Sequence, residues 1–241
     1  MDIYTVSVYI HMLGEIRMNK FYTIPLGLQW LFAVLLAFIG GMPFGLTFYF
    51  SIFKSPAFLF LLPIVFSLSF FSITPILKLI GYFSYYSPML LATKDKNKIE
   101  LHNGTSFDYL CMMKISDFGY KAQKKMLIYY LEGLLNLISE IEKGKLSMDV
   151  NIEGASYFFS KNTVRRLGFT VVKPKIVQRI KTTVNFFDLF WMYSYAKGKI
   201  VVPNVLLINR ASINGKDLLN QKNYIETLLI RLRNITSPNK S

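Results

Sequence analysis

Two long stretches of the chain carry no charged residue, and they constrain its fold more than any other feature of the sequence. The first runs from Phe21 to Phe53, and the second runs from Ser55 to Leu77. A helix rises about 1.5 Å per residue, so about 20 apolar residues cross the roughly 30 Å hydrocarbon core of a bilayer. Each stretch is long enough for one crossing, and together they predict a two-helix transmembrane hairpin over residues 25–80.

A soluble core or a signal peptide would account for these stretches less well. Two adjacent apolar runs would leave a soluble core without amphipathic partners in a chain of 241 residues. A cleaved signal peptide is disfavoured because the first run is too long. Residues 40–45, Gly-Gly-Met-Pro-Phe-Gly, predict a kink, with a re-entrant break as the alternative. The same glycines allow close helix contact, so a homo-oligomer is a further expectation.

Lysine and arginine residues flank the predicted hairpin unequally. Arg17 and Lys20 precede it, Lys54 alone lies in the connection, and three lysines follow within residues 94–98. Positive charge near the ends of membrane spans is retained on the cytoplasmic side, so both termini are predicted to be cytoplasmic. The sequence therefore predicts a multi-pass protein of the plasma (inner) membrane, with the lipid bilayer as its first partner.

The remainder of the chain has the size and charge of a soluble domain. From Lys94 onward there are 24 basic and 12 acidic residues, so this part carries +12 of the total net charge of +14. We expect a cytoplasmic α+β domain attached to the hairpin. The predicted parts are an N-terminal cytoplasmic arm (1–24), the hairpin (25–80), a juxtamembrane segment (81–98), the α+β domain (99–235) and a polar tail (236–241).

Local patterns predict the elements of this domain. The turn signal at residues 102–104, between runs rich in β-formers, predicts a β-hairpin within residues 99–115. Apolar residues repeat at three and four between residues 119 and 144, which predicts an amphipathic helix closed by Gly144. We also expect a strand over 150–159 with a possible bulge at Gly154, a short helix ending at 167 and a strand over 169–172. Residues 200–208 are expected to form a strand or an extended segment, and residues 215–234 a closing helix.

Six aromatic residues crowd into residues 186–195. They predict a helix that buries these rings in the domain core. The alternative is an interfacial helix that places its aromatic face among lipid headgroups.

Few residues in the chain can support catalysis or metal binding. Two histidines and a single cysteine, Cys111, occur without any ligand spacing, so we expect no metal and no cofactor. Cys111 is expected to be buried in a strand. No nucleotide-binding or hydrolase motif is present, which favours a non-enzymatic protein. The alternative is an enzyme at the membrane interface acting on a lipid-linked or acyl substrate, with Glu132, Glu153 or Asp108 as its acid-base group.

A concentration of positive charge is the main functional signal. Between residues 154 and 216, eleven basic residues accompany a single acidic one, Asp188. Each Lys or Arg near an anionic leaflet contributes about 1 kcal/mol to membrane binding. We predict a binding, regulatory or effector module whose basic face binds an anionic lipid surface, a phosphorylated ligand or a partner, whereas nucleic acid is disfavoured because no binding motif occurs. The predicted ligand-binding residues are Lys161, Arg165, Arg166, Lys173, Lys175, Arg179 and Lys181.

Overall fold

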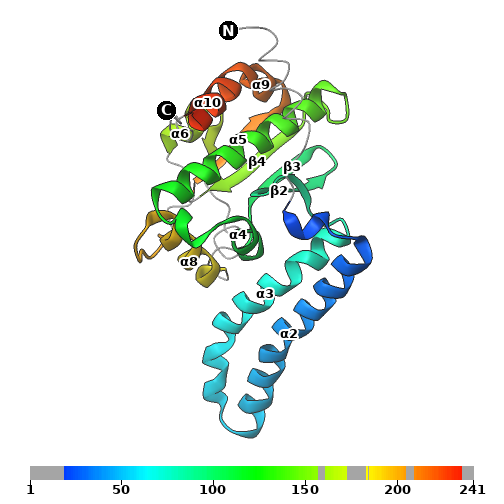
Figure 1. Ribbon diagram of the computed structural model, residues 1–241, viewed down its shortest axis with the longest axis vertical. Coiled ribbons are helices and arrows are strands. Elements are labelled where there is room, and N and C mark those ends of the chain that lie inside the picture. The colour runs from blue at the N-terminus through cyan, green and yellow to red at the C-terminus, as the bar shows by residue number, and fades with distance from the viewer. Residues whose placement is uncertain (1–18, 157–160, 173–182, 184, 205–208, 235–241) are drawn as a thin grey trace, which may run out of the picture.

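A pair of long apolar helices extends from a domain that combines one sheet with several helices in the computed structural model (Figure 1). The structure describes residues 19–156, 161–172, 183, 185–204 and 209–234. Strands and helices share one domain, so the predicted α+β class is confirmed.

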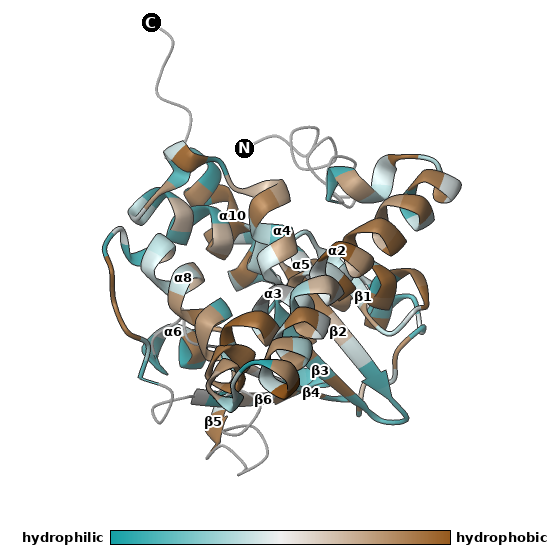
Figure 2. Ribbon diagram, turned by 90° about the horizontal axis from the view of Figure 1, so that it is seen from below, coloured by the Kyte–Doolittle hydropathy of each residue, from teal (hydrophilic) through white to brown (hydrophobic). Residues whose placement is uncertain are grey.

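The two apolar helices lie side by side and share a polar contact. The Ser69 hydroxyl donates to the Gly40 carbonyl of the other helix at 2.8 Å. Within the first helix, the Thr47 hydroxyl donates to the Pro43 carbonyl at 2.8 Å. Figure 2, which views α2 and α3 from below, shows mainly hydrophobic colour on both helices. The elements of this part are η1 (Lys20–Thr23), α2 (Leu26–Phe53), η2 (Pro56–Leu61) and α3 (Leu62–Leu79).

Only α2 is by itself long and apolar enough to cross a membrane within the described residues. A second crossing requires Pro56–Ser67 and Phe71–Leu79, which meet at a 45° bend, to act together as one broken span. The predicted two-helix hairpin is therefore not confirmed, and α2 is a candidate span by its length and composition. Helix α2 continues without interruption through residues 40–45, so the re-entrant break considered there is not found.

The sheet has six strands in the order β1-β2-β3-β4-β6-β5. Neighbouring strands are antiparallel except β3 and β4, which pair in parallel and are connected through helices. Strands β1, β2 and β3 form a meander that begins directly after the apolar helices. The strands are β1 (Ser84–Ser87), β2 (Leu90–Asp95), β3 (Lys98–Asn103), β4 (Asn151–Ser156), β5 (Thr170–Val172) and β6 (Asn209–Asn214).

Helix α5 covers one face of the sheet and supplies much of the core. Its Leu131 and Leu137 are fully buried in one cluster with Ile152 of β4. A Cβ atom at Gly133 would lie 2.6 Å from a methyl carbon of Leu90, so glycine is needed for α5 to approach β2 this closely. The helices of the domain are α4 (Ser106–Met112), η3 (Ile115–Asp117), α5 (Tyr120–Glu142), α6 (Lys161–Arg166), α8 (Phe186–Lys197), α9 (Gly215–Asn220) and α10 (Lys222–Asn234).

The predicted β-hairpin within residues 99–115 is wrong in its second arm. Residues after Gly104 form helix α4, because Thr105 and Asp108 make a capping box that stabilises a helix N-terminus. The hairpin lies one step earlier, between β2 and β3, and uses residues of the predicted juxtamembrane segment. Cys111 consequently lies on α4 and is exposed, which corrects its predicted burial in a strand.

The other local predictions are largely confirmed. Helix α5 occupies the predicted region, and Gly144 adopts the left-handed conformation expected after its end, with φ 69°. Gly154 sits in a continuous register with β6, so the predicted bulge is absent. The expected closing helix is divided at Gln221 into α9 and α10. Residues 200–204 of the predicted strand or extended segment form no strand, and residues 205–208 lie outside the described residues.

Candidate functional site

Helix α6 carries three of the predicted ligand-binding cations. Lys161, Arg165 and Arg166 are exposed, while Val164 on the same helix is buried and anchors it to the core. Among the described residues none of these three cations forms an ion pair. Figure 1 places α6 in the half of the domain remote from α2 and α3. The other four predicted residues, Lys173, Lys175, Arg179 and Lys181, lie outside the described residues.

The described members of the wider basic set belong to several different elements. Arg210 is only 5% exposed and pairs with Glu153. Lys197 and Lys199 flank the end of α8, next to the start of α5, where Gly198 approaches Gly119. Positive charge in the described part of the domain is therefore divided between α6 and the end of α8, with further cations elsewhere.

Glu153 lies at the centre of a charged cluster on the sheet. It accepts a hydrogen bond from the Arg210 guanidinium, and the Lys98 ammonium lies 2.7 Å from the same carboxylate. Burial works to raise the pKa of Glu153, but the hydrogen bonds and charges of Arg210 and Lys98 outweigh it and hold the pKa at about 2. A carboxyl group that stays ionised in this way cannot serve as a general acid near neutral pH.

Asp108 lies at the junction between the apolar helices and the sheet domain, and its side chain is completely buried. It accepts hydrogen bonds from the Tyr85 hydroxyl at 2.8 Å, from the Thr105 amide at 2.9 Å and from the Asn19 amide group at 3.3 Å. Burial raises the pKa of Asp108 to about 6, and these hydrogen bonds oppose the shift. Asp108 thus joins the segment before α2 to β1 and α4.

The third candidate carboxylate has a different partner. Glu132 on α5 is 9% exposed and lies 2.6 Å from the guanidinium of Arg233 on α10. Asp108, Glu132 and Glu153 therefore sit in separate networks, and within the described residues they do not converge on one cleft. No group of three metal-ligating side chains occurs in the described part of the chain.

An apolar groove of about 490 Å³ lies along η1 and the first half of α2. Lys20 provides its positive charge, and the Lys78 ammonium lies nearby, 5.8 Å from the ring centroid of Tyr22 on η1. Sequence reasoning missed this groove because it is formed by the fold of η1 against α2. Its apolar lining consists of Phe21, Ile24, Phe32, Leu35, Leu36 and Ile39.

Comparisons with protein-family models, curated proteins and solved structures find no match to this chain. Its function is therefore inferred from the geometry and chemistry of the chain itself.

Proposed function

We propose that the chain is an integral membrane protein, anchored by α2 and by η2 with α3, whose sheet domain is a cytoplasmic binding module. The exposed apolar surface of α2 carries this proposal. Only 17% of its most apolar 18-residue window is buried, and Leu31, Phe38 and Ile39 are each more than half exposed. Exposing this apolar surface to water costs about 25 cal/mol per Å² of free energy, and exposing it to lipid avoids this cost.

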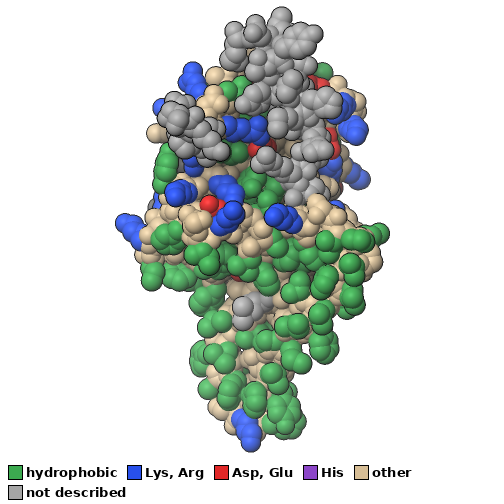
Figure 3. Space-filling view, viewed as in Figure 1, with side chains coloured by type: hydrophobic (Ala, Val, Ile, Leu, Met, Phe, Trp, Pro, Cys, Tyr) green, Lys and Arg blue, Asp and Glu red, His purple; other side chains and the backbone are tan. Residues whose placement is uncertain are grey.

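The placement of charge agrees with a membrane crossing. Lys54 lies at the turn between α2 and η2, and the next cations along the two helices are Lys20 and Lys78 at the opposite end. The space-filling view in Figure 3 shows hydrophobic side chains over the projecting helices, a cation at their tip, and cations again where the domain begins. The 28 residues of α2 span about 42 Å, enough to cross a bilayer in a tilted orientation.

The excess of positive charge on the domain side favours a cytoplasmic location for the sheet domain. Both ends of the anchor then face the cytoplasm, as a hairpin requires. Topology mapping tests this arrangement. In a Cys111→Ser background, Lys54→Cys should react with an impermeant maleimide in intact cells, and Lys96→Cys only after permeabilisation. The chain should also stay in the membrane pellet after alkaline carbonate extraction; its release, or the reverse labelling pattern, would overturn the proposal.

The binding role of the module is assigned to α6. Arg165 and Arg166 are exposed guanidinium groups, which bind phosphate oxygens with paired hydrogen bonds, and Lys161 adds a third charge nearby. Because α6 is remote from α2 and α3, a ligand reaches it from the cytoplasm (Figure 1). This position favours a phosphorylated cytoplasmic ligand over the lipid of the same bilayer.

Charge reversal on α6 tests the binding role. Arg165→Glu should weaken the binding of short-chain polyphosphate to the full chain in detergent by at least about tenfold, because one charge-assisted hydrogen bond is lost and repulsion is added. Isothermal titration at fixed salt measures the affinity. Lys96→Glu, in the exposed turn between β2 and β3, changes the net charge equally and serves as the control. Equal losses for both variants would show nonspecific attraction and contradict the assignment to α6.

A further inference from the structure

One flank of the sheet domain exposes large apolar side chains that do not belong to the anchor. Ile115 is 96% exposed and Ile200 is 85% exposed. A soluble protein rarely exposes several large apolar side chains in one patch unless the patch binds a partner or a membrane. We define this flank as the apolar rim, formed by Leu110, Ile115, Phe118, Tyr120, Ile200 and Val202, each more than half exposed.

Contacts between α8 and the residues that join η3 to α5 hold the rim together. The Gly119 amide donates to the Tyr195 carbonyl at 3.0 Å, and the ring of Phe118 packs edge-on against Tyr195 with centroids 5.8 Å apart. Gly119 and Gly198 both have positive φ, and a Cβ at Gly198 would lie 3.0 Å from the Gly119 Cα. The two glycines thus let the segments before α5 and after α8 lie against each other.

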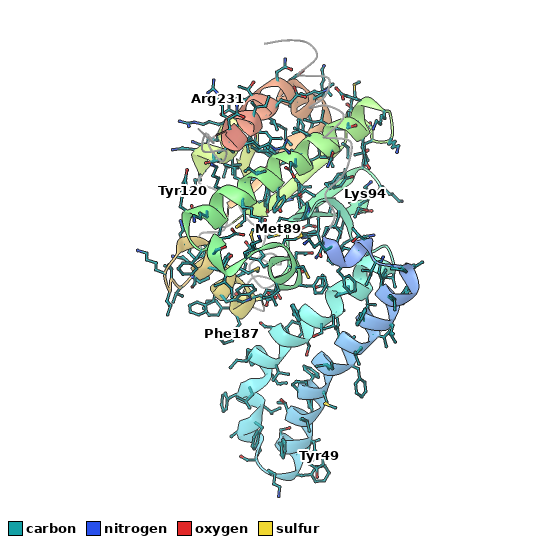
Figure 4. The ribbon with its side chains drawn as sticks, viewed as in Figure 1. Tyr49, Met89, Lys94, Tyr120, Phe187 and Arg231 are labelled. Atoms are coloured by element: carbon teal, nitrogen blue, oxygen red, sulfur yellow. The ribbon has the colours of Figure 1, made fainter. Side chains whose placement is uncertain are left out.

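The rim is continuous with the apolar anchor. Helices α4 and α8 both contact α3, and Ser106 joins them by donating to Asp188 at 2.8 Å and accepting from Trp191 at 2.9 Å. In Figure 1, α8 lies level with the upper part of α3. Figure 4 shows Phe187 of α8 at the lower edge of the domain. If α3 lies in a bilayer, this flank of the domain is therefore close to the surface of the same bilayer.

The charges around the rim identify lipid as its occupant. Lys114, Lys121, Lys197 and Lys199 flank the exposed apolar side chains, and the neighbouring Asp117 is neutralised by Lys125 at 2.8 Å. Lysines around an apolar surface match the phosphates and acyl chains at a membrane interface. Two copies of the chain that met rim to rim would bring like charges together, which disfavours self-association.

We propose that the apolar rim inserts into the headgroup region of the leaflet that α2 and α3 enter, so that the sheet domain has a second, interfacial contact with the membrane. This inference rests on the membrane anchoring proposed above. The domain would then be held against the bilayer by its η3 and α8 side, while α6 remains on the far side.

Fluorescence quenching by lipid tests this contact in the full chain, reconstituted into vesicles that contain anionic phospholipid brominated near the headgroup. Environment-sensitive fluorophores are attached, in a Cys111→Ser background, to Ile115→Cys in the rim, to Leu31→Cys in α2 and to Met148→Cys. Met148 is 53% exposed in the loop after α5 and provides the matched control in water. We expect quenching at Ile115 within a factor of about two of that at Leu31, and almost none at Met148.

The three probes separate the possible failures. Quenching at Leu31 together with a water-like signal at Ile115 would leave the anchor intact and overturn the rim contact. Loss of quenching at Leu31 would overturn the membrane anchoring and the rim contact with it. If lipid quenches Leu31 while neither lipid nor aqueous iodide quenches Ile115, protein covers the rim, and the lipid assignment is wrong.

Discussion

Replacing Glu153 with alanine is expected to destabilise the sheet domain by about 3–5 kcal/mol, because Arg210 then remains buried without its counter-charge. The Arg210 side chain is only 6% exposed, and its Nε atom already has no hydrogen-bond partner among the described residues. Thermal unfolding of the full chain in detergent, followed by near-ultraviolet circular dichroism, measures the change. A loss below about 1 kcal/mol would show that Arg210 finds another partner.

Arg210→Met provides the matched control for this prediction. Its cost should be smaller, because Lys98 still lies 2.7 Å from the Glu153 carboxylate and compensates its charge. The double variant Glu153→Leu with Arg210→Met removes both charges and should recover much of the stability lost in Glu153→Ala. If the double variant is as unstable as Glu153→Ala, lost packing rather than an unpaired charge explains the effect.

The pH dependence of stability gives an independent check of the same cluster. The pKa of Glu153 falls from its usual 4.5 to about 2 in the folded chain. Its contribution is therefore present above about pH 4.5 and lost as the pH falls through about 2. Asp108 acts in the opposite sense, since its pKa rises from 3.8 to about 6. Its contribution is present below about 3.8 and lost as the pH rises through about 6. Wild type and Glu153→Ala both contain Asp108, so this contribution cancels in the difference between their stabilities. That difference should therefore shrink only in acid, where Glu153 becomes protonated.

Phe38→Arg is expected to make membrane insertion of α2 less favourable by about 3 kcal/mol or more, because a charged side chain is placed near the centre of the bilayer. Phe38 is 67% exposed in the middle of α2. If this position faced water, an arginine would change the stability of the protein very little. The substitution therefore distinguishes a helix in lipid from a helix exposed to water. The apparent free energy of insertion can be measured from the glycosylated fraction of chains with acceptor sites on either side of α2.

Two controls accompany Phe38→Arg. Phe38→Leu keeps an apolar side chain and should insert as the wild type does. Tyr224→Arg adds the same charge at an exposed position of α10 and should leave insertion unchanged. If Phe38→Arg inserts like the wild type, or yields a folded chain that dissolves without detergent, α2 does not cross the membrane.

The sequence predicts those features that depend on neighbouring residues. Gly144 and Gly168 follow their helices in the left-handed conformation, and the three-four repeat of α5 faces the core as expected. The hairpin predicted within residues 99–115 is wrong because the capping residues Thr105 and Asp108 start a helix directly after the turn signal at Asn103-Gly104. Both signals are local, so the sequence itself contains the information that corrects this prediction.

Other features depend on contacts between distant parts of the chain and could not be predicted in this way. The parallel pairing of β3 with β4 joins residues separated by α4 and α5. In the sequence Arg210 is one more cation of a basic region, and only the pairing of β6 with β4 brings it to Glu153. The α6 cations lie away from the apolar helices α2 and α3. This position could not be predicted, because no sequence pattern reports which end of a sheet domain faces its apolar helices.

The buried junction around Asp108 has a mechanical consequence. Asn19, Tyr85 and Thr105 all donate to one carboxylate, so the segment that precedes α2 is held against the sheet domain. Membrane helices respond to bilayer thickness by changing their tilt. If α2 and α3 anchor the chain as proposed, a thinner or thicker bilayer would tilt the sheet domain together with these helices. The distance between α6 and the membrane surface would then change.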